Sequence, residues 1–365
     1  MVQKIPASGL ESAGGSFKNV IINGDMSIAQ RATGTTTISG TAHNTLDRFA
    51  GMESTDGTAT LEQHSMSVAD QATTGQRYAA LWKCSGTDSS IGAAEYAGLQ
   101  YFAEAQHLQH FLYGTSAAKD LTLSFWVKSN TTGTYSIGIY KPDNTGYYHP
   151  TTYAISSADT WEKKVIHISP TAGSTSLITS SGGAIANDNG LGIAFYFYTA
   201  LGSNYHTSSI NTWSTTADFG TSDQPNLMSS TDNNWYITGV QLEIGDTASD
   251  FEHIPFDVQF QRCQRYFQSY IDPPLRGAVN ATQNMGRLGM VLPVTMRAAG
   301  TASLGTHGVY DGSNVTSIAS TTVAYITDKQ MEFDVALAAA TVVVGRPGVV
   351  YISGGTTTTT LDAEL

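Results

Sequence analysis

The chain has 365 residues, which is long enough for two domains with separate hydrophobic cores. Only 13% of the residues are charged, while glycine, serine and threonine are abundant, a composition typical of all-β proteins with many tight turns. The net charge of −12 argues against nucleic acid and anionic membranes as partners, because phosphate groups are bound by basic surfaces. We interpret Cys84 and Cys263 as buried thiols, with a single disulfide as the alternative.

The N-terminal residues predict an arm and not a folded element. Residues 1–18 contain Pro6, Gly9 and the Gly14–Gly15 pair and lack apolar periodicity, so we expect them to become ordered only on a partner. They also lack the apolar core of a signal peptide, and no stretch of the chain approaches membrane-spanning length. We therefore expect that the protein does not insert into membranes and that it is released from the cell without a secretion signal.

Alternating apolar and polar residues predict a series of strands before residue 245. The clearest is 121–128, with 134–140 as its expected hairpin partner. A short helix or helical turn is predicted over 101–112. Strands at this spacing, without long helices between them, indicate a β-sandwich. The other predicted strands before residue 200 are 19–23, 45–49, 59–65, 77–84, 161–168 and 192–198.

The stretch 235–245 predicts a long, half-buried strand that closes the first domain. Strict alternation places Tyr236, Thr238, Val240 and Leu242 on one face, and the residues between them on the other. Pairing of this strand with 19–23 would give a jelly roll, although periodicity alone does not determine the topology.

After Pro255 the apolar period changes to that of a helix. The spacing of four, three, four, three predicts a helix over 255–271 with one apolar seam, ended by Pro273 and Pro274. We expect this seam to form a trimer contact, because leaving it in water is unfavourable. The alternative is that it packs onto the jelly roll of its own chain. The seam consists of Phe256, Phe260, Cys263, Phe267 and Tyr270.

The predicted fold is therefore all-β. It comprises an arm at 1–18, a jelly-roll β-sandwich at 19–254, a linker helix at 255–272 and a small C-terminal β-sandwich tip domain at 273–365.

Six short motifs resemble, in the same order, those of bacteriophage tail-fibre and related virion proteins. These proteins carry a jelly-roll domain similar to carbohydrate-binding modules, and the resemblance covers roughly residues 19–270. Residues 293–298 also resemble the opening of the tip domain in such fibres. The motifs are Asn23–Met26 with Gln30–Arg31, Leu46–Phe49, Leu121–Ser129, Ala158–Lys164, Gly239–Glu243 and Cys263–Tyr266.

The resemblance implies a non-enzymatic virion protein, a tail or head fibre or spike, that is homotrimeric and adsorbs to a glycan on the host surface. It would be assembled in the host cytoplasm and act outside the cell. Residues 1–18 would contact other virion proteins, and 276–365 would carry host recognition. The main alternative is a polysaccharide depolymerase or glycosidase tailspike, although the chain lacks the repeats of a long β-helix. A secreted carbohydrate-binding module is a third possibility.

Candidate residues for catalysis and metal binding come from scattered polar side chains. Asp47, Glu243, Asp246, Asp250 and Glu252 are the best carboxylates for acid and base roles, but their sequence shows no facing pair. His107 and His110 could share a metal only with a third ligand, so a surface or packing role is favoured.

A structural calcium ion is a further possibility that the resemblance raises. Asp25 and Glu243 could supply oxygen ligands. The alternatives are that Asp25 belongs to an ordinary turn and that Glu243 pairs with Arg48.

Aromatic residues in polar surroundings are candidates for glycan binding, since aromatic rings stack on the C–H faces of sugars. These are Tyr147, Tyr148, Tyr205 and Trp213. The alternative is that they are half-buried strand residues. Trp126 and Trp161 lie within the family motifs and are interpreted as framework residues.

Overall fold

A computed structural model of the chain describes residues 18–271, 273–279, 285–305, 308–310, 315–338, 347–351 and 358–365. The arm predicted at 1–18 lies outside this range except for Lys18, which donates hydrogen bonds to Ser249 Oγ at 2.6 Å and to the Asp250 carbonyl at 2.7 Å. Within the described residues, no helix is both long and apolar enough to cross a membrane.

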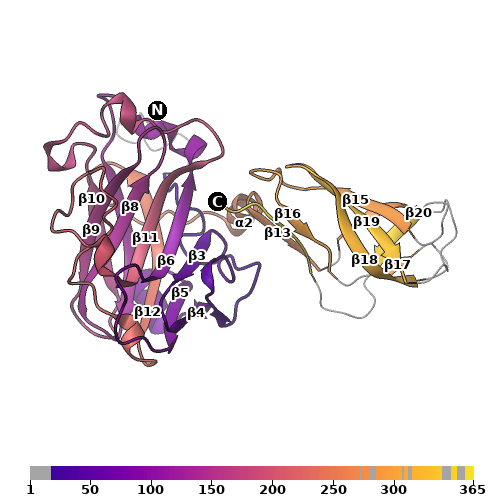
Figure 1. Cartoon of the computed structure of the whole chain (residues 1–365), viewed down its shortest axis with the longest axis horizontal. Helices are drawn as coiled ribbons and strands as arrows, with labels where there is room; N and C mark the ends of the chain where they lie inside the picture. The colour runs from indigo at the N-terminus through magenta and orange to yellow at the C-terminus, as the bar shows by residue number, and fades with distance from the viewer. Residues whose placement is uncertain are drawn as a thin grey trace, which may run out of the picture.

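The larger part of the molecule is a sandwich of two six-stranded antiparallel sheets, which confirms the all-β prediction (Figure 1). Sheet A contains, in order, β1 (Thr36–Thr37), β4 (Thr58–Ser65), β5 (Tyr78–Gly86), β12 (Asn234–Ile244), β7 (Leu121–Ser129) and β10 (Glu162–Ile168). Sheet B contains, in order, β2 (Gly40–Ala42), β3 (Phe49–Glu53), β6 (Tyr96–Glu104), β11 (Leu191–Leu201), β8 (Gly133–Lys141) and β9 (Tyr147–Ile155).

Aromatic side chains from both sheets fill the interior of the sandwich. Phe125 of sheet A lies 5.5 Å from Phe197 and 5.1 Å from Tyr153 of sheet B, ring centre to ring centre. Trp235 is fully buried, and its indole donates a hydrogen bond to the Tyr153 hydroxyl at 3.0 Å. Burial of each such side chain stabilises the fold by roughly 1.5–3 kcal/mol, so this core holds the two sheets together.

The predicted hairpin of 121–128 with 134–140 is wrong, because β7 and β8 belong to different sheets. β7 pairs with β10 and β12, whereas β8 pairs with β9 and β11. The chain therefore crosses from one layer to the other between these strands. Alternation predicts which side chains face inward, but it does not determine which strand is the neighbour.

The strict alternation predicted for 235–245 is also wrong, because a bulge interrupts β12. The pairing with β7 shifts between Thr238 and Gln241, and Gly239 has the left-handed φ of +61°. The extra residue reverses the alternation, so that Ile237 and Val240 both enter the core. Only glycine adopts this backbone conformation readily.

Residues 19–24 lie against β12, as the jelly-roll prediction requires, but they form turns and not a strand. Val20 N–H donates to the Leu242 carbonyl at 3.1 Å, and Val240 N–H donates to the Gly24 carbonyl at 2.8 Å. The buried Asn19 side chain accepts from Leu242 N–H at 3.0 Å and donates to the Val240 carbonyl at 3.1 Å. Asparagine side chains thus replace part of the strand ladder.

Short helices connect the strands of the sandwich. α1 (Val68–Thr74) begins after the capping residue Ser67 and ends at Gly75 in the left-handed region. Of the stretch 101–112, predicted as a short helix or helical turn, residues 105–111 form η2 (Ala105–Phe111), whereas 101–104 belong to strand β6. Among the described residues, the other 3₁₀ turns are η3 (Ala172–Ser174), η4 (Ser181–Gly183), η5 (Ser203–Tyr205) and η6 (Leu227–Ser229).

The helix predicted at 255–271 is shorter than expected. α2 spans Phe256–Gln264, and the chain then forms the strand β13 (Phe267–Tyr270). Phe267 and Tyr270 therefore do not lie on the same helix as Phe256. Their apolar side chains also match a strand with one buried face, and the sequence period does not distinguish the two cases over so short a run.

The C-terminal strands close into a barrel, where a small sandwich was predicted. Both β15 and β20 pair with β14, and both β18 and β20 pair with β17, so the ring has no free edge. In order around the barrel the strands are β14 (Arg276–Val279), β15 (Met285–Val291), β19 (Gln330–Leu337), β18 (Val315–Ile326), β17 (Gly308–Tyr310) and β20 (Pro347–Tyr351).

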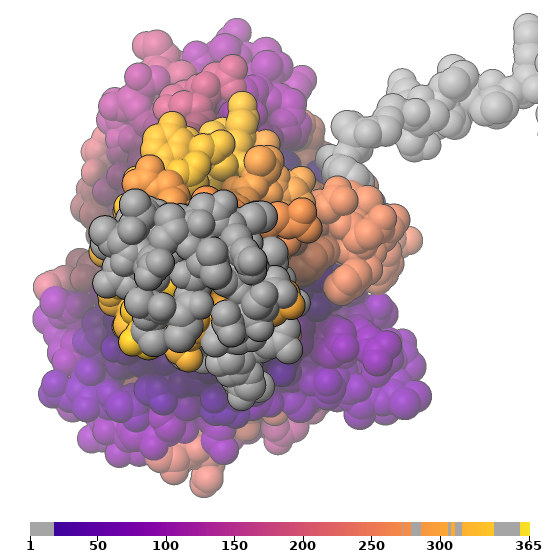
Figure 2. Space-filling view, turned by 90° about the vertical axis from the view of Figure 1, so that its right-hand side faces the viewer, coloured from indigo at the N-terminus to yellow at the C-terminus, as the bar shows by residue number. Residues whose placement is uncertain are grey.

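Between barrel and sandwich lies a three-stranded sheet of β13, β21 (Thr359–Asp362) and β16 (Thr301–Ser303). β21 follows the barrel strand β20 in the sequence, so the C-terminal residues return from the barrel to the sandwich, and the C-terminus lies near α2 (Figure 1). Seen from the barrel end, the sandwich is wider than the domain in front of it (Figure 2).

Candidate functional site

The outer face of sheet B carries an aromatic surface, which we call the aromatic face. Successive strands contribute Phe102 from β6, Tyr196 and Tyr198 from β11, Tyr140 from β8 and Tyr148 from β9. In β11 the alternate residues Phe195 and Phe197 lie in the core, so Tyr196 and Tyr198 point outward.

Small residues between these rings leave room for a further ring. Gly138 lies between Tyr196 of β11 and Pro150 of β9 in the sheet register. A Cβ atom on Gly138 would lie 2.6 Å from Cδ1 of Phe219, so Phe219 packs directly over this glycine. Phe219 comes from the long connection between β11 and β12, and its position depends on the absence of a side chain at 138.

The rings of the aromatic face are held by contacts with one another. Tyr140 and Tyr148 stack at 4.7 Å with 15° between their planes. The Phe219 ring lies edge-on to Tyr148 at 5.4 Å, to Tyr196 at 5.5 Å and to Tyr205 at 5.9 Å. The Tyr205 hydroxyl donates to the Ala94 carbonyl at 3.2 Å. The rings are therefore held in place by contacts within the chain.

A pocket of about 450 Å³ opens on this face. Phe102, Tyr196 and Tyr198 form its aromatic wall, while Gln100 and His43 add polar atoms. Burial raises the pKa of Tyr196 to about 12, so its hydroxyl stays protonated at neutral pH and can donate a hydrogen bond. The pocket thus combines flat apolar surfaces with neutral hydrogen-bonding groups.

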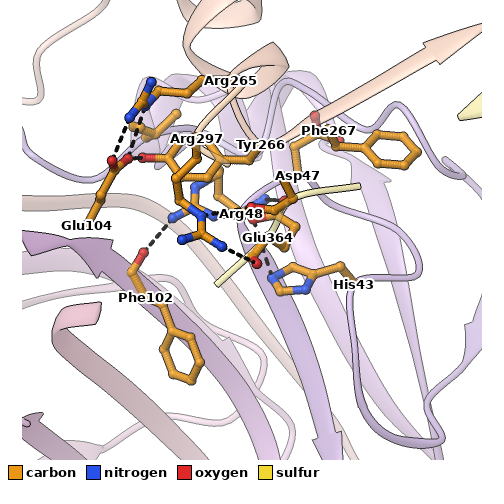
Figure 3. Close-up of polar contacts among 12 residues, drawn as sticks. His43, Asp47, Arg48, Phe102, Glu104, Arg265, Tyr266, Phe267, Arg297 and Glu364 are labelled. Atoms are coloured by element: carbon orange, nitrogen blue, oxygen red, sulfur yellow. Dashed lines mark hydrogen bonds and ion pairs between the residues drawn. The ribbon is translucent and has the colours of Figure 1, made fainter. Parts of the chain in front are cut away.

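One end of this pocket is formed by the returning C-terminal residues. Leu365 lines it beside His43, and the adjacent Glu364 is bound by Arg48, which is buried in the sandwich (Figure 3). Arg48 also donates to the Phe102 carbonyl at 2.5 Å, and its guanidinium lies 3.4 Å from the centre of the Tyr266 ring. The ion pair therefore connects the C-terminal residues to the strand that carries Phe102.

The charges around Glu364 decide its protonation state. Burial alone would raise the pKa of Glu364, but Arg48, His43 and Arg31 together lower it to about 2. Burial lowers the pKa of His43, which lies 3.8 Å from Glu364. Glu364 is therefore ionised at neutral pH and acts as the anion of a buried ion pair.

A second ion pair fixes the same junction. Arg265 donates two hydrogen bonds to Glu104, at 3.0 and 2.6 Å, and the Tyr266 hydroxyl donates to the same carboxylate at 2.6 Å (Figure 3). Arg297 donates to the carbonyls of Ala363 at 2.8 Å and Glu364 at 3.0 Å. The C-terminal domain is thus bound to the sandwich by charged groups that are largely buried.

The four predicted glycan-binding residues are divided between the surface and the interior. Tyr148 and Tyr205 belong to the aromatic face. Tyr147 and Trp213 are buried, and the Trp213 indole donates to the Ser169 carbonyl at 2.9 Å, so neither ring is available to a sugar. Tyr140, Tyr196 and Phe219, which the prediction does not name, also belong to the aromatic face; of these, Tyr196 has a signal in the alternation of Phe and Tyr over 195–198.

The predicted trimer seam is for the most part packed within its own chain. Cys263 is fully buried with Tyr266, Ile22 and Ile28, and Phe260 packs against this cluster. Phe267 is buried on β13, Tyr270 packs against the core of the C-terminal domain, and only Phe256 is strongly exposed, at 66%. The alternative stated for the seam, packing onto its own jelly roll, describes most of these contacts. Cys84 and Cys263 are both free and buried, as predicted.

The carboxylates proposed for catalysis do not meet on the aromatic face. Asp47 is fully buried, accepts a hydrogen bond from Gln30 N–H at 2.9 Å, and burial raises its pKa to about 6. Glu243 accepts from Ser249 Oγ at 2.6 Å and not from Arg48, and Glu252 accepts from Asn19 N–H at 2.9 Å. Asp250 lines a different cavity on sheet A, and Asp246 is exposed.

The predicted metal ligands have other contacts. Asp25 accepts from Ser27 Oγ at 3.0 Å and from Gln259 at 3.4 Å. Burial lowers the pKa of both His107 and His110 on η2. Among the residues that the structure describes, no group of three or more His, Cys, Asp and Glu side chains is placed to hold a metal ion.

Comparison with known proteins gives no family. No known protein family matches the sequence, and no curated protein matches it. Solved structures with similar features include a candidate sugar-binding protein of Bacteroides thetaiotaomicron, 14% identical, covering 62% of this chain and 100% of that one at a TM-score of 0.35. The family 11 carbohydrate-binding module of Clostridium thermocellum, in complex with a tetrasaccharide, is 13% identical over 61% of this chain and 99% of that one, with a TM-score of 0.27.

A third similar structure is the enzymatically active domain of tailspike protein 4 of bacteriophage CBA120. It is 10% identical over 62% of this chain, with a TM-score of 0.30, and this chain covers 22% of its length.

Proposed function

We propose that this chain binds glycans through the aromatic face of sheet B. The observation that carries the proposal is the pocket of about 450 Å³ beside the half-buried rings of Phe102 and Tyr196. Sugars present apolar C–H faces, which stack on aromatic rings, and hydroxyl groups, which bond to tyrosine, glutamine and histidine side chains. The pocket volume lies within the roughly 300–1,000 Å³ usual for ligand pockets.

The fixed rings favour binding. The Tyr140–Tyr148 stack and the edge contacts of Phe219 hold the side chains in place without a ligand. Ordering a mobile side chain on binding opposes affinity by about 0.5–1.5 kcal/mol, and rings that are already packed avoid most of this loss.

We also propose that the chain is a binding protein and not an enzyme. Hydrolysis of a glycosidic bond by the common mechanisms needs two carboxyl groups on either side of it, about 5–9.5 Å apart. None of the described residues that line the pocket on the aromatic face is Asp or Glu. A binding role agrees with this composition better than the depolymerase alternative.

We further propose that the protein is a bacteriophage tail or head fibre that adsorbs to the host surface and forms a homotrimer. The support is the order of the six sequence motifs, together with the elongated arrangement of sandwich and barrel (Figure 1). The trimer proposal rests on the resemblance, because most of the predicted seam is internal. Labelling intact particles with an antibody against the chain tests the location, and light scattering of the purified protein tests the mass.

The glycan proposal is tested with the purified chain on immobilised host polysaccharide and on a glycan array. Tyr196→Ala and Tyr140→Ala should each weaken binding at least about tenfold, which corresponds to about 1.4 kcal/mol. Tyr325→Ala is the matched control, because Tyr325 is 52% exposed but lies on the barrel. Equal losses in all three variants would contradict the assignment of the site. New reducing ends in the polysaccharide would favour the depolymerase.

A further inference from the structure

A cavity on the outer face of sheet A, which we call the sheet A cavity, is separate from the aromatic face. Its volume is about 250 Å³, and it lies between strands β7, β10 and β12 and the segment 250–253. Trp126 of β7 and Lys163 of β10 are register partners and line it together with Thr74, Gln76, Ser124, Asp250, Phe251 and His253. It therefore faces away from sheet B.

The cavity lies at the bulge of β12. Gly239 lines the cavity with a φ of +61°. A Cβ atom there would lie 3.2 Å from Cδ1 of Trp126 and 3.5 Å from Nε2 of Gln76. The absence of a side chain at 239 thus leaves space directly against Cδ1 of the indole and the side-chain amide.

Gln76 supplies the observation that points to a ligand. The residue is 2% exposed, and its Nε2 has no hydrogen-bond partner among the described residues. A buried donor without an acceptor destabilises a protein by about 1–3 kcal/mol, so such groups are nearly always satisfied by protein, water or ligand. The backbone N–H of Gln76 donates to Thr74 Oγ1 at 3.1 Å, which holds the residue at the cavity wall.

We propose that the sheet A cavity binds a single pyranose ring. The indole of Trp126 would pack against the C–H face of the sugar, and Gln76 Nε2 would donate to a ring or hydroxyl oxygen. The volume is below the roughly 300 Å³ at which pockets for larger ligands begin, which fits one ring and not a chain of sugars. Lys163 would pair with a ring that carries a carboxylate, against the repulsion of Asp250, which lines the same cavity.

This site does not depend on the aromatic face, and it would give the protein a second, opposite contact with a glycan. Two weak sites on one molecule raise the effective affinity for a surface that carries many copies of the same sugar. A sugar at the end of a glycan chain would suit the small cavity, whereas the open aromatic face suits several consecutive sugars within the chain.

The test uses the full chain labelled with ¹⁵N and the indole signal of Trp126, which is identified by its loss in Trp126→Phe. The probes are methyl β-glucoside, methyl β-galactoside and methyl N-acetyl-β-glucosaminide as neutral rings, and methyl β-glucuronide as the acidic ring. At least one probe should shift the Trp126 signal in a saturable way. Loss of the amide donor in Gln76→Met should weaken that binding about tenfold, as expected for one hydrogen bond.

Matched variants separate the competing explanations. Lys163→Met should weaken the acidic ring alone, and Tyr196→Ala should leave the Trp126 shift unchanged. If no probe shifts the Trp126 signal, the proposal is wrong, and water is the partner of Gln76. A shift that survives Gln76→Met, or that disappears in Tyr196→Ala, would also overturn it. Thermal unfolding of each variant verifies that it is folded.

Discussion

The ion pair between Glu364 and Arg48 allows a sharp test of how the C-terminal residues are held. The Glu364 side chain is 5% exposed, and the surrounding charges move its pKa from the ordinary 4.5 to about 2. This displacement corresponds to about 3 kcal/mol of stability at neutral pH. Independently of the pKa, breaking a buried ion pair by removing one member destabilises a protein by about 3–5 kcal/mol, because the other charge remains buried without a partner. The two figures agree.

Glu364→Gln should therefore release the C-terminal residues from the sandwich without unfolding the whole chain. The measurement is hydrogen exchange of the β21 amides, which reports the free energy of local opening. A loss of about 3 kcal/mol should raise their exchange about 100-fold. The control is Asp334→Asn, which breaks the exposed pair of Asp334 with Arg287 at 2.8 Å on the barrel, where solvent screens the charges and little change is expected.

The pH dependence provides a second check with a defined sign. Because the pKa of Glu364 is lower in the folded protein, its contribution is fully present above pH 4.5 and disappears as the pH falls towards 2. In the unsubstituted chain, the protection of the β21 amides from hydrogen exchange should decrease as the pH falls through this window, after correction for the intrinsic exchange rate. Glu364→Gln should show no such decrease. A change of less than about tenfold at neutral pH would refute the assigned energy.

Three further outcomes are expected. His149 is buried, and burial lowers its pKa to about 4, so the unfolded chain takes up the proton first and the free energy of unfolding should fall as the pH decreases from 6.5 to 4. In urea denaturation, His149→Phe should remove that part of the pH dependence. Asp47, whose pKa is raised, contributes in the opposite direction. Gly239→Ala should destabilise the sandwich by about 1–2 kcal/mol because of its left-handed φ, and an unchanged urea midpoint would contradict this. Gly34→Ala is the control, since no atom lies within 4 Å of its Cβ position. Phe260→Asp should destabilise the fold, because it buries a charge in the cluster of Cys263 and Tyr266. If the variant instead loses the trimer without losing stability, the seam is a contact between chains, as the sequence predicted.

Sequence patterns located several of the strands, because each of these has one face in the core. They missed β9, and of the strand predicted at 45–49 only Phe49 belongs to β3. The stretch 121–128 is β7 to within a residue, and 235–245 is β12 shifted by one. The same patterns do not determine which strands pair with each other. The prediction paired 121–128 with 134–140, although the two lie in different sheets, because both alternate equally well.

Single residues caused the other errors. The bulge at Gly239 reverses the side-chain alternation, and its only sign in the sequence is a glycine inside a strand pattern. The partner of Arg48 was sought at Glu243, but the structure gives Glu364, 316 residues away from Arg48. Such a contact depends on the path of the whole chain, and no local period reports it.

The sequence predicted only Tyr148 and Tyr205 of the aromatic face, because it does not show which rings are buried. A ring in a polar stretch is a poor guide, because Trp213 and Tyr147 in such stretches are buried. A better guide is a ring at every second position of a strand whose other positions are apolar, as at Tyr196 and Tyr198. The outward rings of one strand then indicate the face, and the neighbouring strands extend it.

The C-terminal residues connect the ion pair to the proposed binding site. Leu365 lines the pocket on the aromatic face, and Arg48 holds both Glu364 and the Phe102 carbonyl. The pocket is therefore completed by residues that the chain brings back after it has formed the barrel. Release of Glu364 would remove Leu365 from the pocket while leaving Tyr196 and Phe219 in place. The same substitution thus separates the contribution of the fixed rings to glycan binding from that of the returning C-terminal residues.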